Sequence, residues 1–516
     1  MPPWLSNLLS IVILLVVVSI VLLCLPKVKE VKHSPAFRRR RVLNWLPLGL
    51  TYAFLYMGRY NLTVSKSVFE HITNANGQLL MTSADFATIF GIGTAVYGCA
   101  FLINGPLTDR FGGRRAILAA AAGAAAANIA MAAITLVVYH RGAGADAVGN
   151  HFVLLFSVLY ALNMYFQSFG AVAVVKVNAP WFHVRERGVF GAIFGILISL
   201  GLYFAYDWSE LILNLFGQDK SMEGALTRLH WVFAAPACLL ILMWVITLLW
   251  VKDTPGEAGH QDFDSGDVSS GDNSPQLGVI QVITLMLRNP IVMTIACVEF
   301  CSGFLRQAIM QWFKTFAKHT DGELGNLSGF VYPNWGLLLC IAGILGGMLA
   351  GVISDHLFQS RRGPVASILY GGMLAGAVVL LFAYKTPAVG WIAIVMSMMI
   401  IGVHGMLSGT ASMDFGGKKN VGIVVGIIDG FVYAGTAAMA LTYGTLLPKE
   451  QLDAAGKIVG PTTEAANWIA WPAAMIPVAV IGLILATRVW NAKPKPKSPP
   501  TSQEPAQQQA AQQQAA

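Results

Sequence analysis

Charged residues are scarce in this chain: Asp, Glu, Lys and Arg together make up 12% of the 516 residues, whereas 55% are hydrophobic. This deficit excludes an ordinary soluble protein, in which about a quarter of the residues are charged. Runs of about 20 apolar residues recur along the chain, each long enough to cross about 30 Å of hydrocarbon as a helix. The composition therefore indicates an all-α polytopic membrane protein.

The six cysteines and the ten histidines show no metal-site spacing, and no nucleophile stands beside a general base. We therefore expect no disulfide framework, no metal, no cofactor and no enzymatic activity. The net charge of +8 could indicate a nucleic-acid partner, but the basic residues stand in short loops between apolar runs. Membrane lipids explain that placement better, so we expect lipids as partners and no nucleic acid.

Thirteen apolar segments are long enough to be membrane helices. The first lies at residues 4–25, and it lacks the positively charged start of a signal peptide. We expect an uncleaved extra helix there, although a removed segment stays an alternative. The other twelve have expected cores at 43–68, 84–104, 116–138, 152–176, 188–206, 230–251, 290–316, 330–352, 364–384, 389–409, 421–447 and 468–489.

A polar stretch rich in Gly, Ser, Asp and Pro divides these twelve segments into six and six. The tail is a low-complexity run of Lys, Pro, Gln and Ala, and it is expected to be disordered. The expected divisions are an extra helix with a basic segment at 1–41, a six-helix bundle at 42–251, a linker at 252–289, a second six-helix bundle at 290–490 and the tail at 491–516.

Lys and Arg concentrate in every second loop. Placing the basic segment 27–41 in the cytoplasm puts the loops with DRFGGRR, HVRERG, QSRRG and GGKK on the same side, together with the carboxyl-terminal tail. Short loops rich in Lys and Arg stay on the cytoplasmic side of a membrane. We therefore expect a multi-pass protein of the cell membrane with its carboxyl terminus in the cytoplasm.

Two arginines lie deep inside apolar runs. Arg59 follows Arg41 by 18 residues and Arg306 follows Arg288 by 18 residues, each in the first helix of its half. At 1.5 Å per residue, both lie about 27 Å from the expected cytoplasmic surface. Taken alone, either arginine could extend outward to the headgroups. The shared offset favours a shared binding role in a fold of two parallel six-helix repeats.

A buried arginine suggests the chemistry of its ligand. Insertion scales give a cost of about 2.5–3.5 kcal/mol for arginine at mid-membrane, which a wet cavity and a ligand can offset. The guanidinium stays charged and binds phosphate or carboxylate through two parallel hydrogen bonds. A central cavity lined by one arginine from each half is therefore expected to hold a small, doubly charged anion, with phosphate as the natural candidate.

Other polar residues at similar depth are candidates for the same cavity. Only one of the two residues after Arg59 can point the same way, because successive helix residues turn by about 100°. For each candidate, helix packing is the alternative. The further substrate-binding candidates are Tyr60, Asn61, Gln167 and Trp312.

Three more ionisable residues stand inside apolar segments. Asp429 is a carboxylate within a helix core, and it either pairs with a basic residue or carries a coupling proton. Lys176 is expected to extend to the cytoplasmic surface, and His404 is expected to be a buried neutral histidine.

One loop carries a recognisable motif. The stretch GPLTDRFGGRR, from Gly105 to Arg115, resembles the loop between the second and third helices of the major facilitator superfamily, and GGMLAGVISDHLFQSRRG is a weaker copy in the second half. The resemblance implies two six-helix bundles around a central cavity. Asp109 and Arg110 are expected to belong to a charge network that gates the cytoplasmic ends of the bundles.

A narrower likeness covers essentially residues 38–490. FQSFGAVAVVKVNAPWFHVRERG, GRYNL and LRQAIMQW resemble the organophosphate:phosphate antiporters, as do DTPGEAG and DFGGKK. The resemblance implies that Arg59 and Arg306 bind phosphate, and it implies a bacterial inner membrane. Three positions depart from the glycerol-phosphate members: Phe101 replaces a lysine, Ile198 a histidine and Gly303 a tyrosine.

These observations lead to an expected function. We expect a secondary transporter, acting as a monomer, that exchanges an organic phosphate ester for inorganic phosphate by alternating access. One alternative is a transporter-like sensor that binds a sugar phosphate and signals to a membrane partner. The other is a proton-coupled carrier of another small organic anion, in which Asp429 takes the proton.

Overall fold

A computed structural model gives the fold of the chain. It describes residue 19 and residues 33–74, 79–140, 144–183, 186–215, 222–265, 279–325, 327, 329–358, 361–449, 451–452 and 458–492. The expected extra helix at 4–25, residue 19 apart, lies outside the described residues, and so does the tail beyond residue 492.

The amino-terminal bundle contains six long helices. Its first helix starts at Pro35, whose fixed φ suits the first helical position, and the preceding Ser34 caps it by accepting from the Phe37 backbone N–H. The six are α2 (Pro35–Phe69), α3 (Ser83–Phe111), α4 (Gly113–His140), α6 (Phe152–Asn178), α7 (Arg187–Tyr203) and α9 (Met222–Trp250). A π-helical segment, Phe204–Trp208, continues α7 into α8 (Ser209–Leu215).

The carboxyl-terminal bundle repeats this arrangement. Its first helix again starts at a proline, Pro290, after a capping Asn289 that accepts from two backbone N–H groups. The six long helices are α11 (Pro290–His319), α13 (Trp335–Val352), α14 (Arg362–Ala383), α15 (Val389–His404), α16 (Ser412–Leu446) and α18 (Met475–Arg488). Two π-helical segments, Ile353–Leu357 and Gly405–Ala411, follow α13 and α15.

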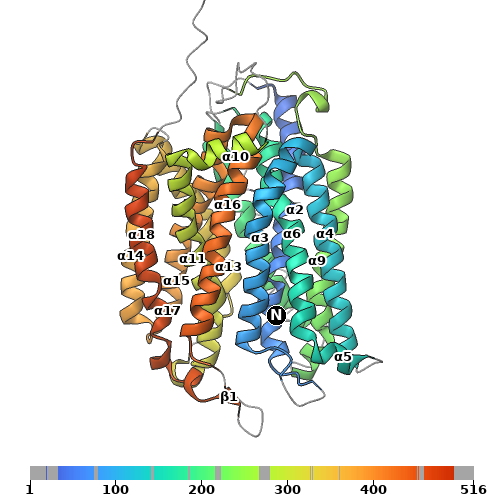
Figure 1. The fold of residues 1–516 in the computed structure, drawn as a ribbon, viewed down its shortest axis with the longest axis vertical. Coiled ribbons are helices and arrows are strands. Elements are labelled where there is room, and N and C mark those ends of the chain that lie inside the picture. The colour runs from blue at the N-terminus through green and yellow to red at the C-terminus, as the bar shows by residue number, and fades with distance from the viewer. Residues whose placement is uncertain are drawn as a thin grey trace, which may run out of the picture.

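Short elements mark the two ends of the molecule. Figure 1 shows α10 (Val279–Arg288) at one end and β1 (Gln451–Leu452) at the other. We call these the linker end and the hairpin end, because α10 belongs to the expected linker and β1 pairs antiparallel with β2 (Ile458–Val459). The remaining short helices are α5 (Ala145–Asn150), α12 (Asp321–Leu324), α17 (Ala470–Ala473) and four 3-10 turns at Ala179–Trp181, Gly256–Ala258, Pro461–Thr463 and Ala465–Trp468.

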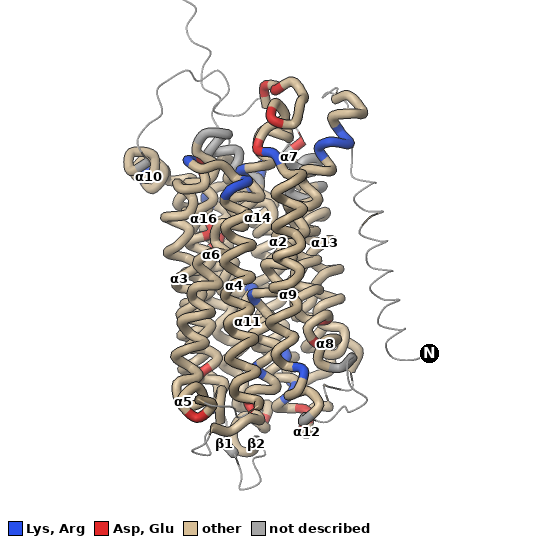
Figure 2. The backbone as a smooth tube through the Cα atoms, turned by 90° about the vertical axis from the view of Figure 1, so that its right-hand side faces the viewer, with Lys and Arg blue, Asp and Glu red and all other residues tan. Residues whose placement is uncertain are grey.

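The helices have the length and composition of membrane spans. Among the described residues, ten helical stretches are long and apolar enough to cross a membrane, and α13 is a shorter apolar helix. The 35-residue α2, which carries the basic cluster together with Arg59 and Lys66, is not one of the ten. Figure 2 shows most charged positions at the two ends of the bundle. The expected all-α membrane fold with two six-helix bundles is confirmed.

The bundles meet chiefly along two helix pairs, α3 on α16 and α7 on α13. Glycines allow the first pair to approach closely: a Cβ added to Gly105 would lie 2.5 Å from the Gly422 carbonyl oxygen, and one added to Gly422 would lie 2.7 Å from the Gly105 oxygen. Backbone atoms cannot turn aside as side chains do, so each position excludes a larger residue. This seam places helices of opposite bundles around the two arginines.

Candidate anion-binding site

Arg59 lies in the middle of α2 and is 1% exposed. Its Nε donates to Gln167 Oε1 of α6 at 3.0 Å, and Nη2 donates to the Tyr97 hydroxyl of α3 at 2.6 Å. Nη1 donates to the hydroxyl of Tyr433, which belongs to α16 of the other bundle. The ring of Tyr56 lies 4.7 Å from the guanidinium carbon. Neutral oxygens and aromatic faces therefore hold this cation, and none of these partners is a carboxylate.

Arg306 lies in α11 and is 3% exposed. Its Nε, Nη1 and Nη2 atoms are all buried and have no hydrogen-bond partner among the described residues. The aromatic ring of Tyr433 lies near Arg306, with its centroid 5.9 Å from the guanidinium carbon. An unpaired buried charge costs several kcal/mol, and a bound anion relieves that cost. Arg306 is thus a cation with vacant donors in the core of the molecule.

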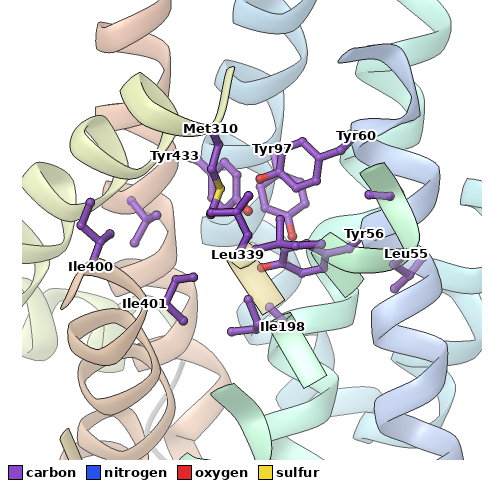
Figure 3. Close-up of a cluster of buried hydrophobic side chains, with 14 of the residues drawn as sticks. Leu55, Tyr56, Tyr60, Tyr97, Ile198, Met310, Leu339, Ile400, Ile401 and Tyr433 are labelled. Carbon is purple, nitrogen blue, oxygen red and sulfur yellow. The ribbon is translucent and has the colours of Figure 1, made fainter. Parts of the chain in front are cut away.

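Tyr433 brings the two arginines together. The guanidinium carbons of Arg59 and Arg306 lie 5.5 Å and 5.9 Å from the centroid of the same ring, so they are within about 11 Å of each other. Figure 3 shows Tyr433 gathered with Tyr56, Tyr60 and Tyr97 between the bundles. We call Arg59, Arg306 and Tyr433 the arginine site.

The other expected binding residues divide into two groups. Gln167 contacts Arg59 directly, and Tyr60 accepts a 2.6 Å hydrogen bond from Gln307, the neighbour of Arg306. Both lie beside the arginine site. Asn61 turns into the amino-terminal bundle, where it donates to Asn128 Oδ1 at 2.8 Å and to the Val232 carbonyl at 3.3 Å. The structure therefore does not bring Asn61 to the arginines.

Trp312 lies farther toward the hairpin end. It lines a pocket with His319, Tyr443 and Trp468, and its ring stands edge-on to Tyr443 at 6.0 Å. Residues 82–84, at the start of α3, also line this pocket, so both bundles contribute to it. Trp312 is thus separated from the arginines by more than a helical turn, since it follows Arg306 by six residues.

A second pocket at the hairpin end is also lined by both bundles. Two ion pairs cross between the bundles there, Lys318 with Glu70 and Lys314 with Glu210. Thr63 also donates to Gln311 across the interface at 2.7 Å. These contacts hold the hairpin ends of the bundles together.

Asp109 closes the linker end. Its carboxylate accepts from the backbone N–H groups of Gly422 and Ile423 in α16, at 3.2 and 3.0 Å. Lys176 donates to the same carboxylate at 2.5 Å, in place of the expected extension to the surface. Arg110 is exposed, and it makes no hydrogen bond to Asp109 among the described residues. The expected gating position of Asp109 therefore corresponds to a contact between bundles, which Arg110 does not join.

The remaining polar groups at depth lie inside the carboxyl-terminal bundle. Asp429 of α16 accepts from the Ser408 hydroxyl and is 3% exposed. His404 hydrogen bonds through Nδ1 to Glu299 Oε2 at 2.8 Å. Glu299 is not among the residues expected from the sequence, although a carboxylate seven residues before Arg306 on the same helix is itself a signal. Among the described residues, no group of three or more His, Cys, Asp or Glu could hold a metal ion.

The three departures from the glycerol-phosphate pattern have local explanations. Phe101 stands edge-on to Tyr97 at 4.6 Å, so an aromatic ring occupies the lysine position. A Cβ on Gly303 would lie 2.0 Å from the Val432 carbonyl oxygen, which excludes a tyrosine at that position. Ile198 is buried in the apolar cluster of Figure 3.

Comparisons with known proteins agree with this architecture. The chain is 22% identical over 475 residues to a protein of Bacillus subtilis (strain 168) named glycerol-3-phosphate transporter, covering 90% of this chain and 96% of that protein. It is 23% identical over 434 residues to the membrane sensor protein UhpC of Escherichia coli (strain K12), covering 79% and 86%. It is 22% identical over 362 residues to a probable hexose phosphate transport protein of Chlamydia pneumoniae, covering 66% and 72%.

A solved structure and a family model complete the comparison. The crystal structure of a D-xylose-proton symporter superposes with a TM-score of 0.53 at 15% identity, covering 88% of this chain and 98% of that one, which shows a shared fold. The model of the Major Facilitator Superfamily matches residues 48–440. The chain therefore belongs to the Major Facilitator Superfamily, and it is a membrane transport protein rather than an enzyme.

Proposed function

We propose that this chain is a secondary transporter that exchanges an organic phosphate ester for inorganic phosphate. The observation that carries the proposal is the arginine site, in which one guanidinium from each bundle faces the same tyrosine and Arg306 keeps three vacant donors. Planar guanidinium groups bind phosphate oxygens in pairs, and relatives named as glycerol-3-phosphate and hexose phosphate transporters support this class of substrate.

Contacts at both ends of the bundles support alternating access. Asp109 joins the bundles at the linker end, and the Lys318–Glu70 and Lys314–Glu210 pairs join them at the hairpin end. Releasing one set while the other holds would open the arginine site to one side of the membrane. Lys and Arg are concentrated in the loops at the linker end, so this end faces the cytoplasmic side of the inner membrane and the carboxyl terminus lies in the cytoplasm.

Electrostatics explains why exchange is coupled. Two unit charges about 11 Å apart repel by about 1.5 kcal/mol at an effective dielectric constant near 20. The empty carrier must keep that repulsion and the unpaired donors of Arg306 buried while it changes state. A phosphate bound between the guanidinium groups removes both penalties, so the loaded carrier crosses more readily.

A flux measurement tests the proposal. Purified protein is reconstituted into vesicles loaded with phosphate, and uptake of radiolabelled phosphate is followed with and without glycerol 3-phosphate or glucose 6-phosphate outside. We expect uptake that needs internal phosphate and is inhibited by one of the two esters. Flux that follows a pH gradient and ignores phosphate would contradict the proposal and favour the proton-coupled carrier of another anion.

The sensor is the second candidate, and the likeness to UhpC over 79% of the chain favours it. A sensor needs the same arginine site for binding but no turnover. Phosphate binding without exchange in the same vesicles would therefore favour the sensor over the transporter as the function of this chain. Arg39→Lys provides a control in either case, because Arg39 is exposed at the linker end.

A further inference from the structure

A buried acidic cluster lies inside the carboxyl-terminal bundle. It consists of Glu299 of α11, His404 of α15 and Asp429 of α16, which are 0%, 4% and 3% exposed. His404 Nδ1 and Glu299 Oε2 are 2.8 Å apart, and Ser408 donates to Asp429. Ionisable groups at this depth are rare in membrane helices and mark ion or proton pathways.

One atom of this acidic cluster has no partner. Glu299 Oε1 is buried and accepts no hydrogen bond from any described residue. A buried carboxylate oxygen without a donor is strongly disfavoured when the group is ionised, and much less so when a proton neutralises it. The unpartnered oxygen therefore points to a proton as the ligand.

The acidic cluster adjoins the arginine site on its linker side. Glu299 and Arg306 are seven residues apart on α11, so they share a helix face about 10 Å apart along the axis. Asp429 and Tyr433 are four residues apart on α16 and also share a face. Both carboxylates thus lie one or two turns from the groups that would hold an anion.

We propose that Glu299, His404 and Asp429 form a proton-binding site whose occupation is coupled to the anion at Arg306. This inference rests on the proposed function, because it takes the arginine site as the place where phosphate binds.

The sign of the coupling follows from the surrounding charges. The titratable groups that face the acidic cluster from its own and neighbouring helices are Cys301 and Arg306 of α11, Tyr370 of α14, Tyr97 of α3 and Tyr433 of α16. Of these, only Arg306 is charged at neutral pH. An anion bound at Arg306 cancels the positive charge that favours the ionised carboxylates.

The size of the coupling can be estimated. Two charges about 10 Å apart at an effective dielectric constant near 20 change the proton affinity by roughly tenfold. Anion binding therefore draws a proton from the solvent onto the acidic cluster, and the proton returns when the anion leaves. By reciprocity, phosphate binds roughly tenfold more tightly to the protonated protein.

Isothermal titration of the purified protein with inorganic phosphate tests this coupling. Titrations in two buffers of different ionisation enthalpy give the number of protons taken up per phosphate bound. Wild type is compared with Glu299→Gln and Asp429→Asn, and with Glu257→Gln, an exposed carboxyl outside the acidic cluster, as the control. Phosphate itself also titrates near neutral pH, but its contribution cancels in the difference between proteins.

We expect the two cluster variants to bind phosphate with fewer protons taken up than wild type, by up to one, whereas Glu257→Gln matches wild type. Equal uptake in all four proteins would overturn the proton site and leave the proposed function standing. No phosphate binding by wild type would overturn both. If neither cluster variant folds, infrared difference spectra of wild type decide: a phosphate-induced protonated-carboxyl band supports the proposal, and its absence overturns it.

Discussion

At the scale of single residues, the two arginines differ in what surrounds them. Arg59 has an oxygen partner for each of its three nitrogens, whereas the three nitrogens of Arg306 have none among the described residues. We therefore expect a ligand to gain more at Arg306, and we expect Arg59 to give up a tyrosine hydroxyl when it binds the same anion. Each role depends on the planar fork of the guanidinium and not on charge alone.

The first prediction replaces each arginine by lysine. Arg59→Lys and Arg306→Lys keep the charge but lose the paired hydrogen bonds, each worth about 1.5–3 kcal/mol when charged. We expect phosphate exchange in vesicles to fall by roughly a hundredfold in either variant. Arg39→Lys is the control, because Arg39 is exposed, and this variant should leave the rate of phosphate exchange unchanged. Exchange at the wild-type rate in Arg306→Lys would contradict the role given to that residue.

The arginines were predictable from sequence because charge inside an apolar run is conspicuous, and their equal offsets in the two halves suggested a common role. Tyr97 and Tyr433 were not predictable, because an aromatic residue in a membrane helix can pack against neighbouring helices as readily as it can line a binding site. Asn61 shows the limit of helix geometry: the 100° turn allowed one neighbour of Arg59 at the site, and only the structure shows that it is Tyr60.

At the scale of elements, the position of Arg306 depends on the close approach of α11 and α16. A Cβ on Gly303 would lie 2.0 Å from the Val432 oxygen, and one on Gly435 would lie 2.0 Å from the Phe300 oxygen. The two backbones therefore touch at two points along the crossing. This contact brings Tyr433 of α16 beside Arg306 of α11.

The second prediction concerns this crossing. Gly303→Ala should destabilise the protein by about 1–3 kcal/mol, because a methyl group meets a backbone oxygen that cannot rotate away. Gly371→Ala is the matched control, since a Cβ there meets nothing within 4 Å. Thermal unfolding in detergent measures both. Equal melting temperatures for Gly303→Ala and wild type would contradict the close crossing.

The third prediction is a pH dependence at the linker end. Burial acts to raise the pKa of Glu186, but hydrogen bonds and charge from Arg41 outweigh it and hold the pKa below 4.5. Burial lowers the pKa of the neighbouring His33 below 6.5. As pH falls through 6.5, His33 gains a proton more readily in the unfolded chain than in the folded protein, which favours unfolding. As pH falls below 4.5, Glu186 loses its charge, and the stability that its pair with Arg41 contributes is lost. Stability should therefore fall on acidification in both windows.

Melting temperatures between pH 8 and pH 4 measure this dependence. Glu186→Gln should melt roughly 2–4 °C lower than wild type at neutral pH, which is the shift that about 1 kcal/mol produces in larger domains. Its melting temperature should also fall less than that of wild type below pH 4.5. Glu257→Gln, which lacks an arginine partner among the described residues, should follow wild type. A wild-type profile in Glu186→Gln would contradict the ion pair.

The sequence predicted the long helices well, because apolar length is a strong signal, but it treated 252–289 as a linker in which the structure contains α10. It also ended the helix core 188–206 at residue 206, whereas a π-helical turn at Phe204–Trp208 leads α7 on into α8, which ends at Leu215. Irregular turns of this kind depend on tertiary packing, which hydropathy does not record.

At the scale of the whole molecule, the two bundles are held at both ends around a charged core. Asp109 is the contact at the linker end, and it binds two backbone N–H groups of the opposite bundle. Its charge strengthens these hydrogen bonds, since charge-assisted bonds are about twice as strong as neutral ones. We expect the strength of this contact to set how often the linker end opens.

The fourth prediction therefore neutralises Asp109. Asp109→Asn should favour the open linker end by roughly tenfold, the ratio that corresponds to about 1.4 kcal/mol. Spin labels at Arg110→Cys and Thr284→Cys report the separation by pulsed magnetic resonance. Both positions are exposed; Arg110 lies in α3 of the amino-terminal bundle, and Thr284 lies in α10, which packs on α11 and α16 of the other bundle. Longer distances should gain population in Asp109→Asn and not in Asp146→Asn, a control at the hairpin end. An unchanged distribution would argue against Asp109 as the gate.

The central claim is that one phosphate binds between Arg59 and Arg306, and equilibrium binding of radiolabelled phosphate to the purified protein tests it most directly. The account predicts one phosphate per chain in wild type, displaced by an organic phosphate ester, and no measurable binding in Arg59→Lys or Arg306→Lys proteins that melt at the wild-type temperature. Phosphate binding of wild-type affinity in both variants would contradict it.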